Sequence, residues 1–335
     1  MFLKAFKNRL PKQTNLRMFA SLDIAGEPTY PKMVSASLPG PITKAKTAEL
    51  GETTCNLAAN IGFMVDIQKS KGNYICDADG NTFLDMFMNI SSTAMGHNHP
   101  SVLEAARSDE MVSLIANRTA QGMHPISQTK QLLDDAFMSV APAGMTRVGP
   151  AMCGSCSVEA AFKHACIAYA QRKRGSMSAA PSQEELASCL KNQAPGSPDY
   201  AILSFKSAFH GRMFGCLSTT RSKAIHKLDM PSFDWPAVDP PRYKFPLADN
   251  EEYNRSQDDE SLRSVAEIID GVFQEKGQEV VAVVIEPILA EGGDIQISGY
   301  FANEIRKLTK EKGIYFIVDE VQSGVVTTGT YWAHE

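Results

Sequence analysis

The sequence predicts an α/β fold in which a mostly parallel sheet is covered by helices on both faces. Continuous apolar segments at 199–205, 280–288 and 314–321 have the length of buried strands, and helical patterns alternate with them. Strands buried on both faces lose the alternation of apolar and polar residues that half-exposed strands show. Such strands alternating with helices are typical of a parallel sheet, whose ligands bind at the carboxyl ends of the strands.

The composition is that of an ordinary globular enzyme. Of the 335 residues, 43% are hydrophobic and 21% are charged, and the net charge is −5. The length favours one large domain with a smaller one. No dense patch of lysine and arginine is interleaved with aromatic residues, so we expect no nucleic-acid partner. The longest apolar segment, 280–285, is too short to cross a bilayer, so we expect no membrane span.

The N-terminal segment 1–25 differs from the rest of the chain. It contains basic residues and no acidic residue before Asp23, and apolar side chains such as Phe2 and Phe6 can share one helical face. This composition is typical of a mitochondrial transit peptide, which predicts a location in the mitochondrial matrix. A disordered basic tail is the alternative.

The segments before the predicted sheet have weaker patterns. Residues 26–60 are rich in proline, which predicts an extended arm. The segment 72–86 predicts a hairpin, because two apolar runs flank Asp79-Gly80, a favoured tight-turn pair. Residues 101–140 have helical patterns with breaks.

Three helices are expected beside the predicted strands, at 153–175, 261–277 and 300–313. Ser155 or Ser157 can cap the first helix, and Glu159 is expected in its first turn. The second helix is amphipathic, with one side expected to be buried. This side comprises Leu262, Val265, Ile268, Ile269 and Phe273. Two segments are expected at the surface: the first is a polar loop with a short helix, and the second is rich in proline and then acidic. These segments are 176–198 and 235–260.

The segment CGSCS, 153–157, opens the first of these helices. Gly154 lets the backbone approach a ligand closely, and Ser155 and the free N–H groups of the first turn can donate to a phosphate. An ordinary N-cap is the alternative. Cys153 and Cys156 form a CxxC pair, for which redox, metal-binding and incidental roles stay open. The odd number of cysteines, seven, argues for thiols rather than a disulfide framework.

Two further segments follow predicted strands. In SAFHGR, 207–212, Phe209 can stack on a planar cofactor and Arg212 can bind a carboxylate through two nitrogens. A loop with an exposed arginine is the alternative. In IEPILAEGGD, Glu286 and Glu291 lie near the same edge of the sheet, where Glu291 can pair with an arginine of the site. Two surface acids are the alternative here.

Asp319 ends the last predicted strand. An aspartate at that position can hold the protonated ring nitrogen of pyridoxal 5′-phosphate (PLP), and Gln322 is close enough to reach the same ligand. A capping or structural aspartate is the alternative. Taken together, a phosphate site, a ring-stacking aromatic, a carboxylate-binding arginine and a ring-nitrogen partner point to PLP.

Several segments resemble the class III (omega-amino acid) aminotransferases of PLP fold type I. In chain order they are GNYICDADGNTFLDM, CGSCSVEAAFK, SFKSAFHGR, VIEPILAEGGD and IVDEVQSG. Longer segments near 193–236 resemble the 4-aminobutyrate (GABA) aminotransferases of eukaryotes. The resemblance covers about residues 30–335. It implies a large PLP-binding domain at 111–335, preceded by an N-terminal arm and small-domain segment at 26–110.

The resemblance implies a role for each matching residue. For the cofactor, Gly154 and Ser155 would bind the phosphate, Phe209 would stack on the ring, Asp319 would hold the ring nitrogen and Gln322 would contact the ring hydroxyl. The implied substrates are GABA and 2-oxoglutarate.

The residues implied at the substrate are Ile90, Arg212 and Glu291. Arg212 would bind the substrate carboxylate. Glu291 would pair with a second arginine while GABA is bound and release it for 2-oxoglutarate. Ile90 would line the site.

Cys153 and Cys156 match a pair that ligates a [2Fe–2S] cluster in animal members. The resemblance implies a homodimer in which two cysteines from each subunit supply the four thiolates of such a cluster.

The sequence also departs from the family. The Schiff-base lysine of the family lies about thirty residues beyond the aspartate that holds the ring nitrogen. No lysine occurs from Gly313 to Glu335, so the catalytic lysine would lie beyond Glu335. We expect a truncated chain or incomplete gene model that is inactive by itself. Val325 and Val326 replace an expected glycine-rich turn and Thr330 an expected lysine, which predicts a distorted turn.

Two other functions stay open. The chain can be a non-catalytic paralogue that acts as a binding partner, or an omega-aminotransferase for another substrate such as ornithine or β-alanine.

Overall fold

The computed structural model describes residues 24–54, 61–117, 119–120 and 122–335. Nearly all of the predicted targeting segment lies outside these ranges. The chain divides into two compact units, Met1–Val148 and Gly149–Glu335, which are described one at a time. The domain division that the resemblance implies, at residue 110, stays a prediction.

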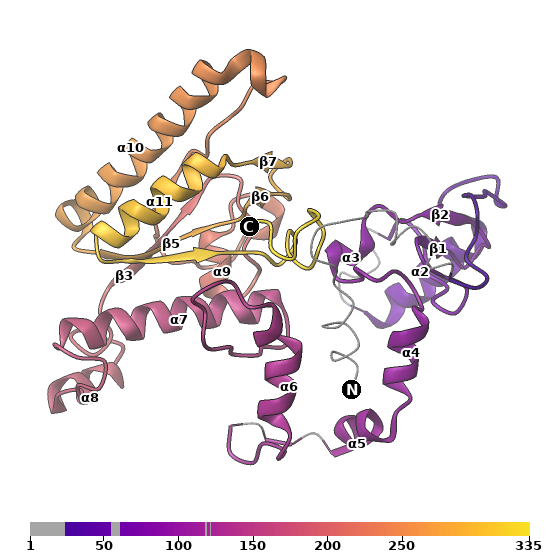
Figure 1. Ribbon diagram of the computed structural model, residues 1–335, viewed down its shortest axis with the longest axis horizontal. Coiled ribbons are helices and arrows are strands. Elements are labelled where there is room, and N and C mark those ends of the chain that lie inside the picture. The colour runs from indigo at the N-terminus through magenta and orange to yellow at the C-terminus, as the bar shows by residue number, and fades with distance from the viewer. Residues whose placement is uncertain (1–23, 55–60, 118, 121) are drawn as a thin grey trace. The chain divides into compact units, whose positions relative to one another are not determined.

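The first unit contains short helices and one hairpin (Figure 1). Its elements are α2 (Pro41–Thr53), β1 (Tyr74–Cys76), β2 (Thr82–Leu84), α3 (Met88–Ser91), α4 (Pro100–Ala106), α5 (Asp109–Asn117), α6 (Thr129–Ala136) and the 3-10 helix η3 (Met138–Val140). β1 and β2 are antiparallel, with Ile75 opposite Phe83. Gly80, in the turn between them, has a φ of 87°, which glycine adopts readily. The predicted hairpin is confirmed.

Helix α2 corrects the prediction of an extended arm. It begins at Pro41, whose fixed φ suits the first position of a helix. Its N-terminal end is capped by a carboxylate distant in sequence: Asp79 accepts from the N–H groups of Ile42 at 2.7 Å and Thr43 at 2.9 Å. Because this cap comes from the hairpin turn, the residues around Pro41 do not show it by themselves.

The second unit is built on a four-stranded sheet. Its elements are α7 (Gly154–Lys173), α8 (Gln183–Cys189), β3 (Tyr200–Phe205), α9 (Phe214–Thr219), η4 (Ala224–His226), β4 (Ala237–Val238), η5 (Leu247–Asn250), α10 (Glu251–Lys276), β5 (Glu279–Ile285), β6 (Ile288–Leu289), β7 (Ile295–Gln296), α11 (Gly299–Glu311) and β8 (Tyr315–Val318). The strand order is β4-β3-β5-β8, and every pair in it is parallel. The predicted α/β fold with a parallel sheet is confirmed.

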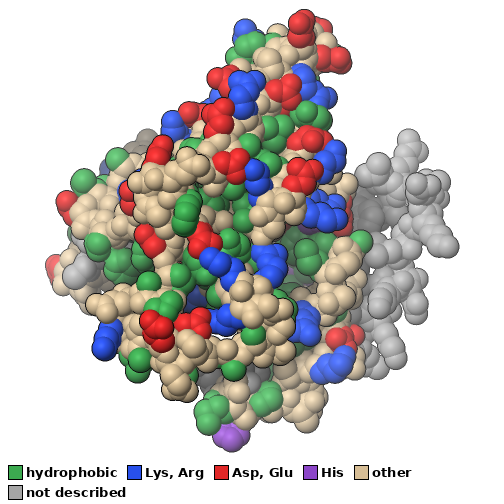
Figure 2. All heavy atoms as spheres, turned by 90° about the vertical axis from the view of Figure 1, so that its left-hand side faces the viewer, with side chains coloured by type: hydrophobic (Ala, Val, Ile, Leu, Met, Phe, Trp, Pro, Cys, Tyr) green, Lys and Arg blue, Asp and Glu red, His purple; other side chains and the backbone are tan. Residues whose placement is uncertain are grey.

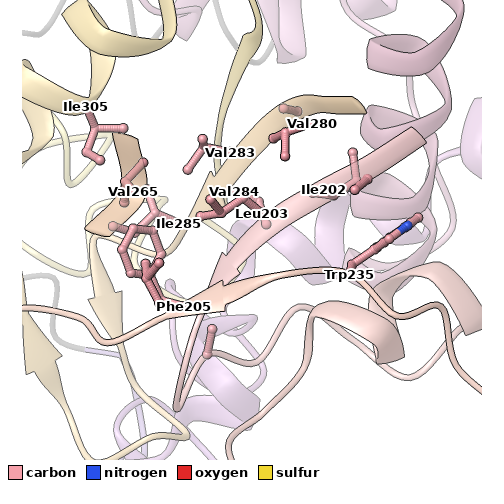
Figure 3. Packing of buried hydrophobic residues seen from close by; sticks show 14 of the residues in the cluster. Ile202, Leu203, Phe205, Trp235, Val265, Val280, Val283, Val284, Ile285 and Ile305 are labelled. Carbon is pink, nitrogen blue, oxygen red and sulfur yellow. The ribbon is translucent and has the colours of Figure 1, made fainter. Parts of the chain in front are cut away.

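Helices cover both faces of this sheet. Figure 1 shows β3 and β5 between α10 and α11 on one side and α7 on the other. Figure 3 shows the buried side chains that fill these layers, among them Ile202 and Phe205 of β3 and Val283 and Ile285 of β5. The Phe205 ring meets the Phe301 ring of α11 edge to face at 5.9 Å. The long apolar strands are therefore explained by burial on both faces.

Helix α7 begins one residue after an unexpected cap. Cys153, not Ser155 or Ser157, is the N-cap, and its Sγ accepts from the Cys156 N–H at 3.4 Å. Glu159 lies beyond the first turn, where its carboxylate accepts from another backbone N–H. The prediction was wrong because a sulfur atom can take the place of a hydroxyl as the accepting group.

Helix α10 is longer than predicted, since it begins at Glu251 rather than 261. The acidic side chains of Glu251 and Glu252 favour a helix N-terminus here, so the acidic second part of the segment 235–260 begins the helix. Phe273 was expected on the buried side but is 58% exposed, and Val272 is buried instead. Figure 2 shows acidic and basic side chains interspersed along the upper part of the molecule, where α10 lies.

The distorted turn expected after β8 stays a prediction. Val325 and Val326 have φ values of 59° and 72°, in the left-handed region that β-branched residues rarely adopt. Among the described residues, no helix has both the length and the apolar character needed to cross a membrane.

Candidate functional site

Three neighbouring parallel strands end at the same edge of the sheet. β3 leads into a loop that contains Phe209, β5 is followed by Glu286, and β8 is followed by Asp319. The Asp319 N–H donates to the Ile285 carbonyl at 2.8 Å, and the Phe209 N–H donates to Glu286 Oε1 at 2.8 Å. The ends of the three strands therefore form one cluster, at the place where parallel sheets bind ligands.

The Asp319 carboxylate is buried, with 4% of its side chain exposed. His210 Nδ1 lies 2.8 Å from Asp319 Oδ2, and the Val321 N–H donates to Oδ1 at 3.0 Å. A carboxylate has about four acceptor positions, so further donors can bind. Within the described ranges no lysine or arginine forms an ion pair with Asp319.

Glu286 is a second buried carboxyl group in this cluster. Burial raises the pKa of Glu286 to about 7. The charge of His210 and the Phe209 N–H lower this pKa, whereas the charge of Asp319 raises it further. Glu286 is 6% exposed, and a buried carboxyl group away from water holds its proton more tightly than an exposed one. Glu286 is therefore no surface acid.

The N-terminal end of α7 packs against this edge. A Cβ at Gly154 would lie 2.6 Å from Val321 Cγ1, and a Cβ at Gly211 would lie 2.0 Å from Ser155 Oγ, so glycine allows both close approaches. Ser155 Oγ accepts from the Arg212 N–H at 2.9 Å and can still donate its own hydrogen. Because a helix N-terminus attracts anions, α7 offers a place for a phosphate here.

Positive charge gathers on the outer side of the cluster. Lys223 Nζ lies 2.6 Å from Glu291 Oε2. This bond lowers the pKa of Glu291, and the charges of His226 and Arg212 lower it further. The Phe209 ring is half-buried and meets the His226 ring edge to face at 5.1 Å. Arg212 is exposed and has no ion-pair partner in the part of the chain that the structure describes.

Two predicted residues lie apart from these contacts. Gln322 is half-buried in the turn after β8. Ile90 belongs to the other unit, so its predicted place beside the substrate stays a prediction. Its φ of 59° is one of four consecutive left-handed values in α3.

Cys153 and Cys156 lie side by side at the start of α7, with 3.5 Å between their sulfur atoms. The pKa of Cys153 is lowered, first by the Cys156 N–H. Among the described residues, no group of three or more His, Cys, Asp or Glu could hold a metal ion. The pair supplies two of the four thiolates that a [2Fe–2S] cluster needs.

Sequence reasoning missed His210, Gly211 and Lys223. His210 and Gly211 lie between Phe209 and Arg212, two residues that the sequence did single out. A titratable side chain just after a predicted strand could therefore have marked His210 as a candidate. Lys223 pairs with a glutamate 68 positions away, and no local pattern shows such a pair.

The chain matches a known family over most of its length. The family described as aminotransferase class-III matches residues 57–335. The 4-aminobutyrate aminotransferase of Mycosarcoma maydis is 46% identical over 313 residues, covering 92% of this chain and 60% of that protein. The mitochondrial 4-aminobutyrate aminotransferase of Mus musculus is 42% identical over 318 residues, which cover 94% of this chain and 62% of that protein. The chain thus spans about three fifths of the length of these relatives.

A solved structure agrees with this match. The lysine aminotransferase from M. tuberculosis has a TM-score of 0.71 at 25% identity, covering 87% of this chain and 62% of that one. The predicted fold class, PLP fold type I, is confirmed.

Proposed function

Because the chain belongs to the aminotransferase class-III family, we propose that it forms the cofactor-binding part of a 4-aminobutyrate aminotransferase. The whole protein would move the amino group of GABA to 2-oxoglutarate. The observation that carries this proposal is a buried carboxylate, Asp319, which ends a parallel strand beside the N-terminus of α7 and has no lysine or arginine partner among the described residues.

Class III aminotransferases depend on PLP, and the residues present fit it. Asp319 has acceptor positions left for a protonated ring nitrogen, and Ser155 keeps its hydroxyl hydrogen for a phosphate. Gly154, in the first turn of α7, would offer its backbone N–H to the phosphate, Phe209 would cover the ring, and Gln322 would contact the ring hydroxyl. Bound PLP supplies an electron sink for the reacting carbon.

Arg212 is proposed to bind the substrate carboxylate. The support is its exposed guanidinium, which has no ion-pair partner in the described ranges, and the ring of Phe209 nearby in the same loop. Glu291 is proposed to exchange cation partners between GABA and 2-oxoglutarate. In the structure its partner is Lys223, so the second arginine stays a prediction. Ile90 is proposed to line the substrate site.

A binding experiment tests the cofactor site. Fluorescence titration of the full chain is expected to show tighter binding of PLP than of pyridoxal, which has no phosphate. Ser155→Ala should reduce the ratio of the affinity for PLP to the affinity for pyridoxal roughly tenfold, because a hydrogen bond to a charged group is lost. Ser157→Ala is the matched control, because its hydroxyl donates to the Cys153 carbonyl. Equal binding of PLP and pyridoxal by the unaltered chain would contradict the proposal.

Turnover by the whole protein tests the substrate. Rates with GABA are expected to exceed those with ornithine and β-alanine. Arg212→Gln should raise the KM for GABA by roughly tenfold or more, because a carboxylate partner is lost. Faster turnover of ornithine would favour a different omega-aminotransferase.

We also propose a homodimer with a [2Fe–2S] cluster between the subunits, bound by Cys153 and Cys156 of each. The 3.5 Å separation of the two sulfur atoms supports a shared ligand. Native mass spectrometry and iron analysis test it: the unaltered protein should contain two iron atoms per dimer, and Cys153→Ser should contain none.

The mitochondrial matrix is the proposed location. The basic N-terminus and the mitochondrial relative from Mus musculus support it. An import assay with isolated mitochondria, with and without residues 1–25, checks it.

A further inference from the structure

Four consecutive residues of the first unit, Met88–Ser91, have left-handed backbone. Their φ values lie between 48° and 60°, and the ψ values of Asn89 and Ile90 are both 50°. Residues other than glycine visit this region singly rather than as a turn, because Cβ comes too close to the following carbonyl oxygen. The turn also leaves the side chains of Phe87 and Ile90 exposed. Such strain persists only where the surroundings hold the backbone in place.

One carboxylate holds the start of this turn. Asp85 Oδ1 accepts from the N–H groups of Phe87 at 3.0 Å and Met88 at 2.9 Å. Within the turn, the Ile90 N–H donates to the Phe87 carbonyl at 2.9 Å. The side chain of Asp85 is 6% exposed. Burial would raise the pKa of Asp85, but its hydrogen bonds outweigh burial and lower this pKa, so the acceptor is ionised near neutral pH.

His97 fixes the Asp85 carboxylate through its second oxygen. The Nε2 atom of His97 lies 2.7 Å from Asp85 Oδ2, and 10% of the His97 side chain is exposed. An ionised carboxylate only accepts, so Nε2 carries the hydrogen. The backbone of His97 is fixed as well, because it exchanges two hydrogen bonds of 2.8 Å with Gly72. The carboxylate therefore has one oxygen on a fixed donor and the other on the turn.

We propose that Asp85 and His97 are positioning residues, which hold the left-handed turn Met88–Ser91 and thereby set the place of the Ile90 side chain at the substrate. This inference rests on the proposed function, in which Ile90 lines the substrate site. A strained turn that exposes apolar side chains lowers the stability of the chain, and a role in binding accounts for it. Without the hydrogen bond from His97 the carboxylate can rotate, and the turn can relax toward right-handed backbone.

Two variants of nearly equal length separate the hydrogen bond of His97 from the volume of its side chain. The side-chain amide of His97→Gln can donate to Asp85, whereas the thioether of His97→Met cannot. Hydrogen exchange of the full chain measures whether the turn is held. In His97→Met the Ile90 amide should exchange roughly tenfold faster, because a hydrogen bond to a charged group is lost. In His97→Gln it should exchange at close to the unaltered rate, and the β5 amides should not change in either variant.

Turnover by the whole protein measures the effect on the substrate. His97→Met should raise the KM for GABA roughly tenfold and change kcat by less than about twofold, because a displaced Ile90 loses contacts that bind substrate and transition state equally. His97→Gln should have a KM close to that of the unaltered protein. A purely structural role of His97 would lower the fraction of folded protein, and so lower kcat with the KM unchanged. That outcome, or equal KM values in the two variants, overturns the inference.

A double variant tests whether His97 acts through Ile90. Ile90→Ala alone should raise the KM for GABA roughly tenfold, because apolar contacts with the substrate are lost. Adding His97→Met should raise this KM little further, because the side chain that the turn positions is already gone. If the two effects multiply, His97 acts by another route and the inference is wrong.

The same measurements separate this inference from the proposed function. If Ile90→Ala raises the KM for GABA but the two His97 variants have equal KM values, the inference fails and the proposed substrate site survives. If Ile90→Ala leaves the KM unchanged, the proposed place of Ile90 is wrong and the inference falls with it. If the unaltered whole protein does not convert GABA, the proposed function is overturned as well.

Discussion

The two units of the chain are stabilised in different ways. Every member of the large buried apolar cluster lies in Gly149–Glu335, around the parallel sheet. In the described part of Met1–Val148 the buried apolar residues are Ile75 and Cys76, and helices α3 to α6 bury no residue. Polar side chains there bond to the backbone instead. The comparison teaches that patterned apolar strands define the second unit, whereas specific hydrogen bonds define the first.

The largest expected effect tests the core of the second unit. Phe205 is 0% exposed on β3. Phe205→Ala should lower the free energy of unfolding by about 3–5 kcal/mol, because the side chain leaves a cavity. Urea unfolding measures this. Ile115→Ala, at a position 71% exposed on α5, is the counterpart in the first unit and should change stability by less than about 0.5 kcal/mol. Similar losses in both variants would contradict the comparison.

The next effect concerns pH and Glu286. Its pKa in the folded chain is raised to about 7 from an ordinary 4.5, so the folded state holds the proton more tightly than the unfolded state. Its stabilising contribution is complete below about pH 4.5 and is lost as the pH rises to about 7. The loss should reach about 3 kcal/mol at most. Hydrogen exchange of the β5 amides measures this loss of stability. In Glu286→Gln the stability of β5 should no longer depend on pH in this range.

Asp85 provides the opposite case in the first unit. Burial alone would raise its pKa, but the bond to His97 and the N–H groups of Met88 and Phe87 outweigh burial and lower it. This contribution is present above the ordinary pKa of 3.8 and is lost as the pH falls through the folded value. Acid should therefore weaken β1 and β2 but not β5. If acid changes the hydrogen exchange of β1, β2 and β5 in the same direction, the two units do not differ in their response to pH.

A third effect tests the polar bonds of the first unit. Asn81 is buried and accepts from the N–H groups of Val34 at 2.7 Å and Ser35 at 2.9 Å. Asn81→Ala should cost about 2 kcal/mol, because buried partners lose their bonds. Hydrogen exchange at Val34 and Ser35 checks this. Asn117→Ala, an exposed asparagine that donates to its own helix, is the matched control and should have little effect.

The smallest effect lies in the turn after β8, outside the core of the second unit. Val325→Gly combined with Val326→Gly should raise stability by about 1 kcal/mol, since both positions have left-handed backbone. Thermal unfolding measures it. Val321→Gly, in the same turn but without a positive φ, should lower stability instead. A loss of stability in the double variant would show that the turn is not strained.

Much of the fold could be predicted because its signals are local. The strands and the hairpin turn at Asp79-Gly80 are encoded in neighbouring residues, and the structure has them. The first ten residues of α10 were missed because they are acidic and polar and lack the apolar spacing that marks the rest of the helix. The positions of Asp319 and Ser155 at element ends were also visible, although their roles stay predictions.

The sequence by itself determined the order of strands and helices, the family resemblance and the places where strands end. Only the tertiary structure decided that His210 faces Asp319, 109 positions away, and that Phe209 donates to Glu286, 77 positions away. It also decided that Asp79 caps α2 from 36 and 37 positions away. A local pattern records which face of an element is apolar. The partner of a buried polar group depends on which distant segment folds beside it.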